Sequence, residues 1–235
     1  MEKSYQEILR LLDKMNVSSD KFVFRGSTDY LKDINNPKQS EAVMDLVDRA
    51  MKTEEDLLYI VAIGAITNIA SAILIEPKIL ERIVVVWLGG QPFYWPNNKG
   101  AFNLVQDLNA SRLIFDCGVP LVHIPMYSVS SHLLTNLPEI QRYVEGQGEI
   151  GDYLAKIFRE FSTDHFAYSK VIWDISAIAY LINDQWVETE IVNSPILTDL
   201  MTWSIDHSRH FIRNATVVRR DPIFRDFFTK LTRNG

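Results

Sequence analysis

Few side chains that can do chemistry stand out from their surroundings in this sequence, and Asp174 is the clearest of them. It is the only acid in the apolar segment SKVIWDISAIAYLI, residues 169–182. A carboxylate in such a segment needs a cation, hydrogen-bond donors or a metal ion. Two interpretations remain open: either one helix carries Asp174 to a ligand, or the helix begins at Ile175 and Asp174 caps it.

The histidines give a weaker signal. His207 and His210 stand three residues apart, which suits a metal pair, but no third ligand follows at a set spacing. His123 lies inside the apolar run LVHI, where a histidine is more often a hydrogen-bonded core residue than a catalyst. The sequence has no nucleophile elbow and no phosphate-binding glycine loop. Residue types therefore indicate a site without specifying its reaction.

Glycines close two apolar runs that have the length of buried strands. Residues 57–63 end at Gly64, residues 83–88 end at Gly89, and an apolar helical stretch, residues 67–74, lies between them. Continuous apolar runs suit parallel strands covered on both faces, so we predict a right-handed βαβ unit. Ligands of such sheets bind beyond the carboxyl ends of the strands. Glycine there either lets a backbone approach a ligand or only makes a tight strand exit.

The remaining elements follow from apolar periodicity and capping signals. Ser40 is a good N-cap for a helix to about Met51. An aromatic-rich loop, residues 91–102, either covers a flat ligand or packs down on the protein. We expect further helices at 5–15, 107–115, 137–161 with a break near 146–148, and 223–231, and further strands at 22–24, 121–124, 187–196 and the second half of 203–218. The whole chain, residues 1–235, is predicted to be one α/β domain with a mostly parallel central sheet and helices on both faces.

Composition limits the classes of partner. The chain has 235 residues and a net charge of −6, which suits one globular domain and argues against a nucleic-acid partner. Cys117 is the only cysteine, so no disulfide forms within the chain, as expected for the reducing cytoplasm. The first ten residues are too charged for a secretory signal, and no apolar run approaches the ~20 residues of a membrane-spanning helix. We therefore expect a cytoplasmic protein that does not bind membranes.

Four collinear segments resemble those of the inosine-uridine preferring nucleoside hydrolase family: VAIGAITNIASAILIEPKI followed by VVVWLGG, AFNLVQDLNASRLIFDCGVPLVHIP, VIWDISAIAYLI and SRHFIRNATVVRRDPIFRDFFTKL. The resemblance implies hydrolysis of the N-glycosidic bond of a ribonucleoside, a small-molecule substrate, to a base and ribose. It also implies a Ca²⁺ ion at the carboxyl ends of the strands, which binds the ribose 2′- and 3′-hydroxyls and the attacking water. An aspartate takes the proton of that water, and the transition state resembles an oxocarbenium ion.

The resemblance implies roles for single residues. Asp174 matches the late aspartate that binds the metal, and Ile63 matches the position that gives its backbone carbonyl to the metal. Asn103 matches the asparagine that holds the ribose. A second ribose-binding asparagine is expected at Asn97 or at its neighbour Asn98.

Three features depart from the family pattern. The family opens with a strand and a cluster of aspartates that supply the other metal ligands and the general base, and MEKSYQEILR holds no such cluster. The chain is therefore expected to be truncated at its N-terminus, and no general base is identified. Ala101 replaces a ribose-binding glutamate. Trp173 replaces a histidine that helps the base leave, which indicates a different branch in which Trp173 either stacks on a base or only packs.

Two hypotheses for function follow. The first is a ribonucleoside hydrolase whose calcium site is incomplete in this chain, and the alternative is a non-catalytic relative that binds nucleosides or carbohydrates. Ca²⁺ takes roughly 6–8 oxygen ligands, so one carboxylate and one carbonyl predict weak binding. The absent strand lies centrally in the family's sheet, so a neighbouring strand is expected to have an unpaired edge. We expect homo-oligomers that form along that edge.

Overall fold

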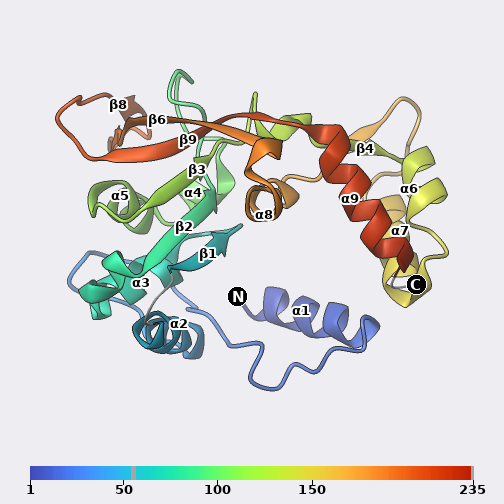
Figure 1. The fold of residues 1–235 in the computed structure, drawn as a ribbon, viewed down its shortest axis with the longest axis horizontal. Helices are drawn as coiled ribbons and strands as arrows, with labels where there is room; N and C mark the ends of the chain where they lie inside the picture. The colour runs from blue at the N-terminus through green and yellow to red at the C-terminus, as the bar shows by residue number, and fades with distance from the viewer. Residues whose placement is uncertain (54–56, 234–235) are drawn as a thin grey trace.

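A five-stranded sheet organises the computed structural model, which describes residues 1–53 and 57–233 (Figure 1). The strand order is β1-β2-β3-β9-β6. The strands are β1 (Leu58–Ala62), β2 (Ile83–Leu88), β3 (Leu121–Ile124), β6 (Val187–Asn193) and β9 (Phe211–Val218). β1, β2, β3 and β9 run parallel, and only β6 is antiparallel to its neighbour. The predicted mostly parallel sheet is confirmed.

The predicted strand–helix–strand unit is present. β1 and β2 pair in parallel, with Leu58 opposite Ile83 and Ala62 opposite Trp87, and α3 (Thr67–Ile75) connects them. Every residue of β2 is buried, as expected for a continuous apolar run in a parallel sheet. The expected N-cap of α2 (Glu41–Lys52) is also present, because the Ser40 hydroxyl accepts a hydrogen bond from the Val43 amide at 3.3 Å.

Helices cover both faces of the sheet. α2, α3 and α5 (Leu108–Asp116) pack on one face, and α8 (Ile175–Ile182) and α9 (Arg220–Arg233) pack on the other. Successive residues of β2 point to opposite faces, as strand geometry requires. Ile83, Val85 and Trp87 join the first hydrophobic cluster, and Val84, Val86 and Leu88 join the second. The three-layer arrangement predicted from the sequence is therefore correct.

A smaller helical unit lies alongside α9 (Figure 1). It consists of α6 (Leu137–Tyr143), α7 (Gly148–Glu160) and a two-stranded ribbon of β4 (Leu134–Asn136) and β5 (Ser169–Val171). α1 (Glu2–Lys14) contacts α7 and buries only Leu12. Six short elements complete the described fold: α4 (Phe102–Val105), β7 (Ile196–Leu197), β8 (Trp203–Ser204) and the 3-10 helices η1 (Pro77–Glu81), η2 (Ser130–His132) and η3 (Asp184–Trp186). None of the described helices is long and apolar enough to cross a membrane.

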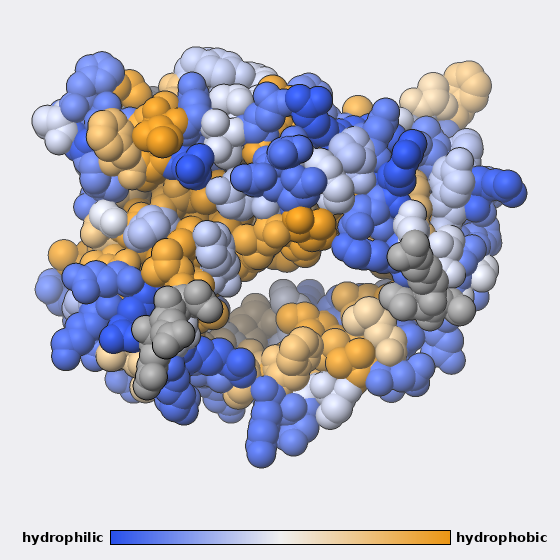
Figure 2. Space-filling model, viewed as in Figure 1, coloured by the Kyte–Doolittle hydropathy of each residue, from blue (hydrophilic) through white to orange (hydrophobic). Residues whose placement is uncertain are grey.

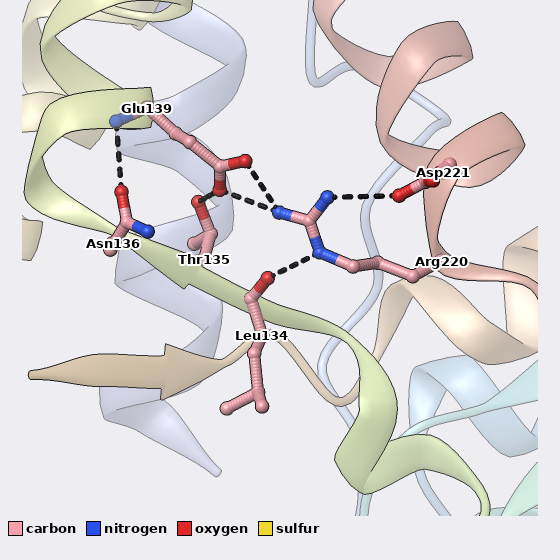
Figure 3. Close-up of polar contacts among 6 residues, drawn as sticks. All are labelled: Leu134, Thr135, Asn136, Glu139, Arg220 and Asp221. Carbon is pink, nitrogen blue, oxygen red and sulfur yellow. Dashed lines mark hydrogen bonds and ion pairs between the residues drawn. The ribbon is translucent and has the colours of Figure 1, made fainter.

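A charged cluster ties the helical unit to α9 (Figure 3). Nη2 of Arg220 donates to both carboxylate oxygens of Glu139, at 2.7 and 2.6 Å, and its Nε donates to the Leu134 carbonyl at 2.8 Å. The Thr135 hydroxyl donates to the same carboxylate at 2.8 Å. The backbone amide of Glu139 is bound by the Asn136 side chain, which caps α6. Both carboxylate oxygens of Glu139 therefore have partners, and Arg220 binds both the ribbon and α6.

Two expectations from the sequence are wrong. Residues 22–24 form a turn and irregular chain rather than a strand, and Phe22 is 65% exposed. A three-residue run gains little as a strand unless another strand pairs with it, and no described strand does. Residues 169–182 are not one helix. Residues 169–171 pair with β4 as strand β5, and the helix begins only at Ile175, because tertiary pairing overrides local helix preference.

β1 forms one edge of the sheet, and in the described part of the chain β2 is its only strand partner. Tyr59 on this strand is 50% exposed, and Ile178 on the neighbouring helix α8 is 48% exposed. Figure 2 shows apolar surface around a hollow between α1 and the sheet. An apolar strand edge of this kind can pair with another strand.

Candidate functional site

The segments that carry the predicted site residues converge at the carboxyl end of the sheet. Ile63 directly follows β1, and Tyr127 lies three residues beyond β3. The ring of Trp173 stands edge-on to that of Tyr127, with their centroids 5.7 Å apart. α8, which begins just after Asp174, contacts both β1 and β2. The Trp173–Asp174 pair therefore lies on the side of the sheet where ligands bind in this fold class.

Asp174 stands at the N-cap position of α8, but its side chain caps nothing. No described residue donates a hydrogen bond to its carboxylate or forms an ion pair with it. Burial raises the pKa of this carboxyl above its ordinary value of 3.8, since no donor or cation offsets the desolvation. Of the two interpretations left open by the sequence, the helix start at Ile175 is correct, whereas the side-chain cap is absent. The carboxylate keeps its full capacity for a ligand.

Ile63 and Asn103 line the same cavity, of about 470 Å³. The adjoining carbonyl of Gly64 accepts a hydrogen bond from the Trp87 indole at 3.1 Å, which fixes the exit from β1. Asp174 and Trp173 do not line this cavity. The structure thus brings Ile63 and Asn103 together in one cavity and places Trp173 in the aromatic cluster described below, with Asp174 next to it in the chain. The metal-binding roles predicted for Ile63 and Asp174 remain predictions.

Asn103 is held by one end of its side chain. Its Nδ2 donates to the carbonyl of Leu88, the last residue of β2, at 2.8 Å, while no described residue donates to its Oδ1. This leaves one acceptor for a ligand hydroxyl, as the predicted role in binding ribose requires. Ala101, buried at the start of α4, offers no polar group beside it.

The two loop asparagines differ in the hydrogen bonds that their side chains make. Asn98 is wholly buried, accepts from the Gln91 amide at 2.7 Å and donates to the Met201 carbonyl at 3.2 Å. It is therefore a structural residue of the loop. Among the described residues, Asn97 accepts only from the Lys99 backbone amide, in a local turn, and so remains the candidate for a second contact with ribose.

Three aromatic rings from separate elements form a cluster near Asp174. Trp95, in the loop after β2, stacks on Tyr127 with a centroid distance of 5.7 Å, and Tyr127 meets Trp173. Trp95 and Tyr127 keep 36% and 41% of their surface exposed. The sequence analysis singled out the aromatic loop and Trp173 but missed Tyr127. Its place just beyond a buried strand was the available signal.

The histidines named in the sequence analysis do not form part of this candidate site. His123 is wholly buried, with Nε2 2.7 Å from the Gly89 carbonyl and Nδ1 2.9 Å from the Asn214 side chain, so the core interpretation is correct. Burial lowers its pKa to about 4. Within the described ranges, no group of three or more His, Cys, Asp or Glu side chains is placed to hold a metal ion. The suggested pair of His207 and His210 therefore gains no third ligand.

The described residues do not fit a complete calcium site. Ca²⁺ takes roughly 6–8 oxygen ligands, most often from several carboxylates. Asp174 is one carboxylate without partners, and no described cluster of acids accompanies it. These residues supply at most part of a coordination shell, so we assign no chemical step to a metal here.

Three comparisons relate the chain to known proteins. It is 27% identical over 167 residues to the inosine-uridine preferring nucleoside hydrolase of Crithidia fasciculata, covering 67% of this chain and 52% of the relative. It is 28% identical over 173 residues to the pyrimidine-specific ribonucleoside hydrolase of Shigella flexneri, covering 67% and 54%. The purine-preferring ribonucleoside hydrolase of Gardnerella vaginalis has the same fold, with a TM-score of 0.68 at 21% identity over 84% of this chain and 67% of that one.

The chain spans about half the length of the curated relatives it matches. The family model for inosine-uridine preferring nucleoside hydrolases matches residues 5–223, which is most of the sequence. The α/β fold and the collinear segments agree with that match. The chain belongs to the inosine-uridine preferring nucleoside hydrolase family.

Proposed function

We propose that this chain supplies the ribonucleoside-binding face of an enzyme that hydrolyses the N-glycosidic bond, releasing a base and ribose. The names of the relatives, which describe hydrolases of inosine, uridine and pyrimidine ribonucleosides, support the reaction class. The observation that carries the proposal is the unpartnered carboxylate of Asp174, next in sequence to an aromatic cluster at the carboxyl end of a parallel sheet. Ligands bind at this end in this class of fold.

The available side chains suit the parts of a nucleoside. The free Oδ1 of Asn103 accepts a hydrogen bond from a ribose hydroxyl. The rings of Trp95 and Trp173 offer a face to the base, and such stacking contributes ~1–3 kcal/mol per base. A carboxylate at Asp174 stabilises positive charge that develops on the ribosyl group as the bond to the base breaks.

The second candidate function is a non-catalytic relative that binds nucleosides or carbohydrates. The described residues contain no cluster of three or more acids, histidines or cysteines placed to hold a metal ion, which is compatible with such a relative, whereas the names of the matched relatives support the hydrolase. A binding protein needs the aromatic cluster and Asn103 but not a general base. The two functions therefore share a binding site and differ in turnover.

Ribose release and ligand binding separate the two functions. Inosine and uridine are offered to the chain with and without added Ca²⁺, and calorimetry measures binding of the same nucleosides. Ribose release that is lost in Asp174→Asn and kept in Asp184→Asn supports the hydrolase, because Asp184 is an exposed acid beyond the other end of α8. Binding without release supports the binding protein. Neither binding nor release would refute both functions for this chain.

A further inference from the structure

The exit from β2 is held by two side chains from different elements. Nδ2 of Asn103 donates to the Leu88 carbonyl at 2.8 Å, and Nε2 of His123 lies 2.7 Å from the carbonyl of the next residue, Gly89. Gly90 follows with φ +92°, a conformation that favours glycine. The backbone that anchors Asn103 is therefore the backbone that His123 contacts, one peptide unit further along.

His123 is enclosed by rings and carries no charge at neutral pH. Phe93 stacks on it at a centroid distance of 4.9 Å, and Phe115 and Trp203 meet it edge-on. Burial lowers its pKa to about 4, and no described charged side chain contacts the ring. A neutral imidazole has one N–H, so it donates through one nitrogen and accepts through the other.

The shorter contact decides where that proton lies. We place it on Nε2, where it is donated to the Gly89 carbonyl, because this carbonyl can only accept. Nδ1 then needs a donor, and the Asn214 amide supplies one when its NH₂ group faces the ring. That orientation gives up the 3.1 Å contact of Asn214 with Glu190, whose side chain is exposed and can turn to water. The histidine is thereby fixed in one tautomer.

We propose that His123 is a positioning residue for Asn103, an inference that rests on the proposed function. Its Nε2–H bond fixes the peptide after Gly89, and this fixes the orientation of the preceding Leu88 carbonyl to which Asn103 is bound. Two backbone bonds flank this contact, from the Gly89 amide to the Ile124 carbonyl at 3.3 Å and from the Met126 amide to the Gly90 carbonyl at 3.0 Å. His123 supplies the anchor for the peptide between them, and without it the ribose-binding amide loses part of its fixed direction. His123 touches no substrate and acts only through the backbone.

The first test follows the Asn103 side-chain amide directly and needs no ligand. NMR spectra of asparagine-labelled chain are compared for wild type, His123→Phe and His123→Gln. His123→Phe keeps a ring but has no donor, so we expect the Asn103 NH₂ signal to shift in this variant. His123→Gln has an amide that can donate, so we expect the signal to return toward its wild-type position. The Asn109 amide, bound to the Leu31 carbonyl at 2.9 Å, is the internal control and should stay in place.

The outcomes of this test are decisive in either direction. An Asn103 signal that does not move in His123→Phe overturns the proposal. So does a shift of the Asn103 and Asn109 signals by the same amount, because general loosening would cause it. If His123→Phe does not fold, His123→Asn replaces it, since that side chain stays polar but is too short to reach the Gly89 carbonyl.

The second test measures the choice between sugars. Wild type and His123→Phe are titrated with a ribonucleoside and its 2′- and 3′-deoxy analogues. If Asn103 loses its direction, the preference for the ribonucleoside over the affected analogue should fall about tenfold, the value of one hydrogen bond. An unchanged preference with weaker binding of every analogue indicates a structural role and overturns the proposal. A wild type that binds no nucleoside contradicts the proposed function instead, and the amide signals then decide the inference alone.

Discussion

Two carboxylates, Glu139 and Asp174, sit at helix starts in this molecule and have opposite environments. Glu139, in the first turn of α6, accepts from the Arg220 guanidinium and from the Thr135 hydroxyl (Figure 3). Asp174, at the start of α8, accepts from no described residue, and burial raises the pKa of its carboxyl. Both are flanked by apolar side chains, so hydrophobicity does not distinguish them. Their partners do.

The contrast separates a structural acid from a functional one. Glu139 joins α6 to α9, and both of its oxygens already accept hydrogen bonds from the protein. Asp174 contributes nothing comparable to the fold: its carboxylate has no partner among the described residues, partial burial raises its pKa, and the residue stays accessible to solvent. An accessible carboxylate with a perturbed pKa is a candidate for binding a ligand, and the family resemblance of the sequence predicts a ligand at the same residue.

The largest expected effect is the loss of the Arg220 contacts. Arg220→Gln removes the charge that pairs with Glu139 and leaves a partly buried carboxylate uncompensated. We expect the free energy of unfolding to fall by about 2–3 kcal/mol, measured by urea denaturation. Arg225→Gln is the matched control on the same helix, where no described residue forms an ion pair, and should change it by less than ~0.5 kcal/mol. Equal losses in the two variants would show that the cluster contributes no more than a surface charge.

The second prediction concerns Asp174, where removing the charge is not expected to reduce the stability of the fold. Asp174→Asn should leave the stability at neutral pH unchanged or slightly higher, within ~0.5 kcal/mol, while nucleoside binding weakens at least about tenfold. A raised folded-state pKa means that the acid favours folding below its unfolded value of 3.8, and that this advantage is lost as the pH rises through the folded-state pKa. The stability of Asp174→Asn relative to that of wild type should therefore increase from acidic to neutral pH. Denaturation curves at several pH values measure this, and a variant that is less stable at neutral pH would contradict it.

The third prediction concerns the metal. Because the described residues contain no group of three or more acids, histidines or cysteines placed to hold a metal ion, Ca²⁺ should bind this chain with a dissociation constant of about 10⁻³ M or weaker. Calorimetry on the 235-residue chain, with Asp174→Asn as the reference, measures it. A micromolar constant would mean that other ligands complete the site.

The smallest expected effect lies at the edge of the sheet. We propose that two copies of the chain pair along β1, whose outer edge has no described strand partner and whose Tyr59 is exposed. Tyr59→Lys places a charge on that edge and should weaken the pairing, whereas Tyr94→Lys, in the loop after β2, should not. Light scattering over a range of concentrations measures the mass, and a monomer throughout would refute the proposal.

Local signals predicted the fold where one segment determines its own structure. The apolar runs on either side of α3 indicated parallel strands, and Ser40 indicated a helix start; both are correct. Strand β5 was missed because residues 169–171 become a strand only by pairing with β4. The bond between Arg220 and Glu139 spans 81 residues, which no local pattern reveals.

The site was predicted in a different way. Asp174 stood out because its type conflicts with its neighbours, but only the family resemblance singled out a metal among its possible partners. Tyr127 was missed because its meaning depends on Trp95 and Trp173, which approach it from other elements. Chemistry that resides in one residue can be read from a sequence, whereas chemistry that resides in a contact requires coordinates.

One missing methyl group couples the exits of the first two strands. A Cβ built on Gly89 would lie 2.1 Å from the Trp87 ring, and it is this ring that donates to the Gly64 carbonyl beyond β1. An alanine at position 89 would push the Trp87 indole aside. This would break its hydrogen bond to the Gly64 carbonyl, next to Ile63 at the end of β1. A substitution after β2 would therefore also disturb the chain that follows β1.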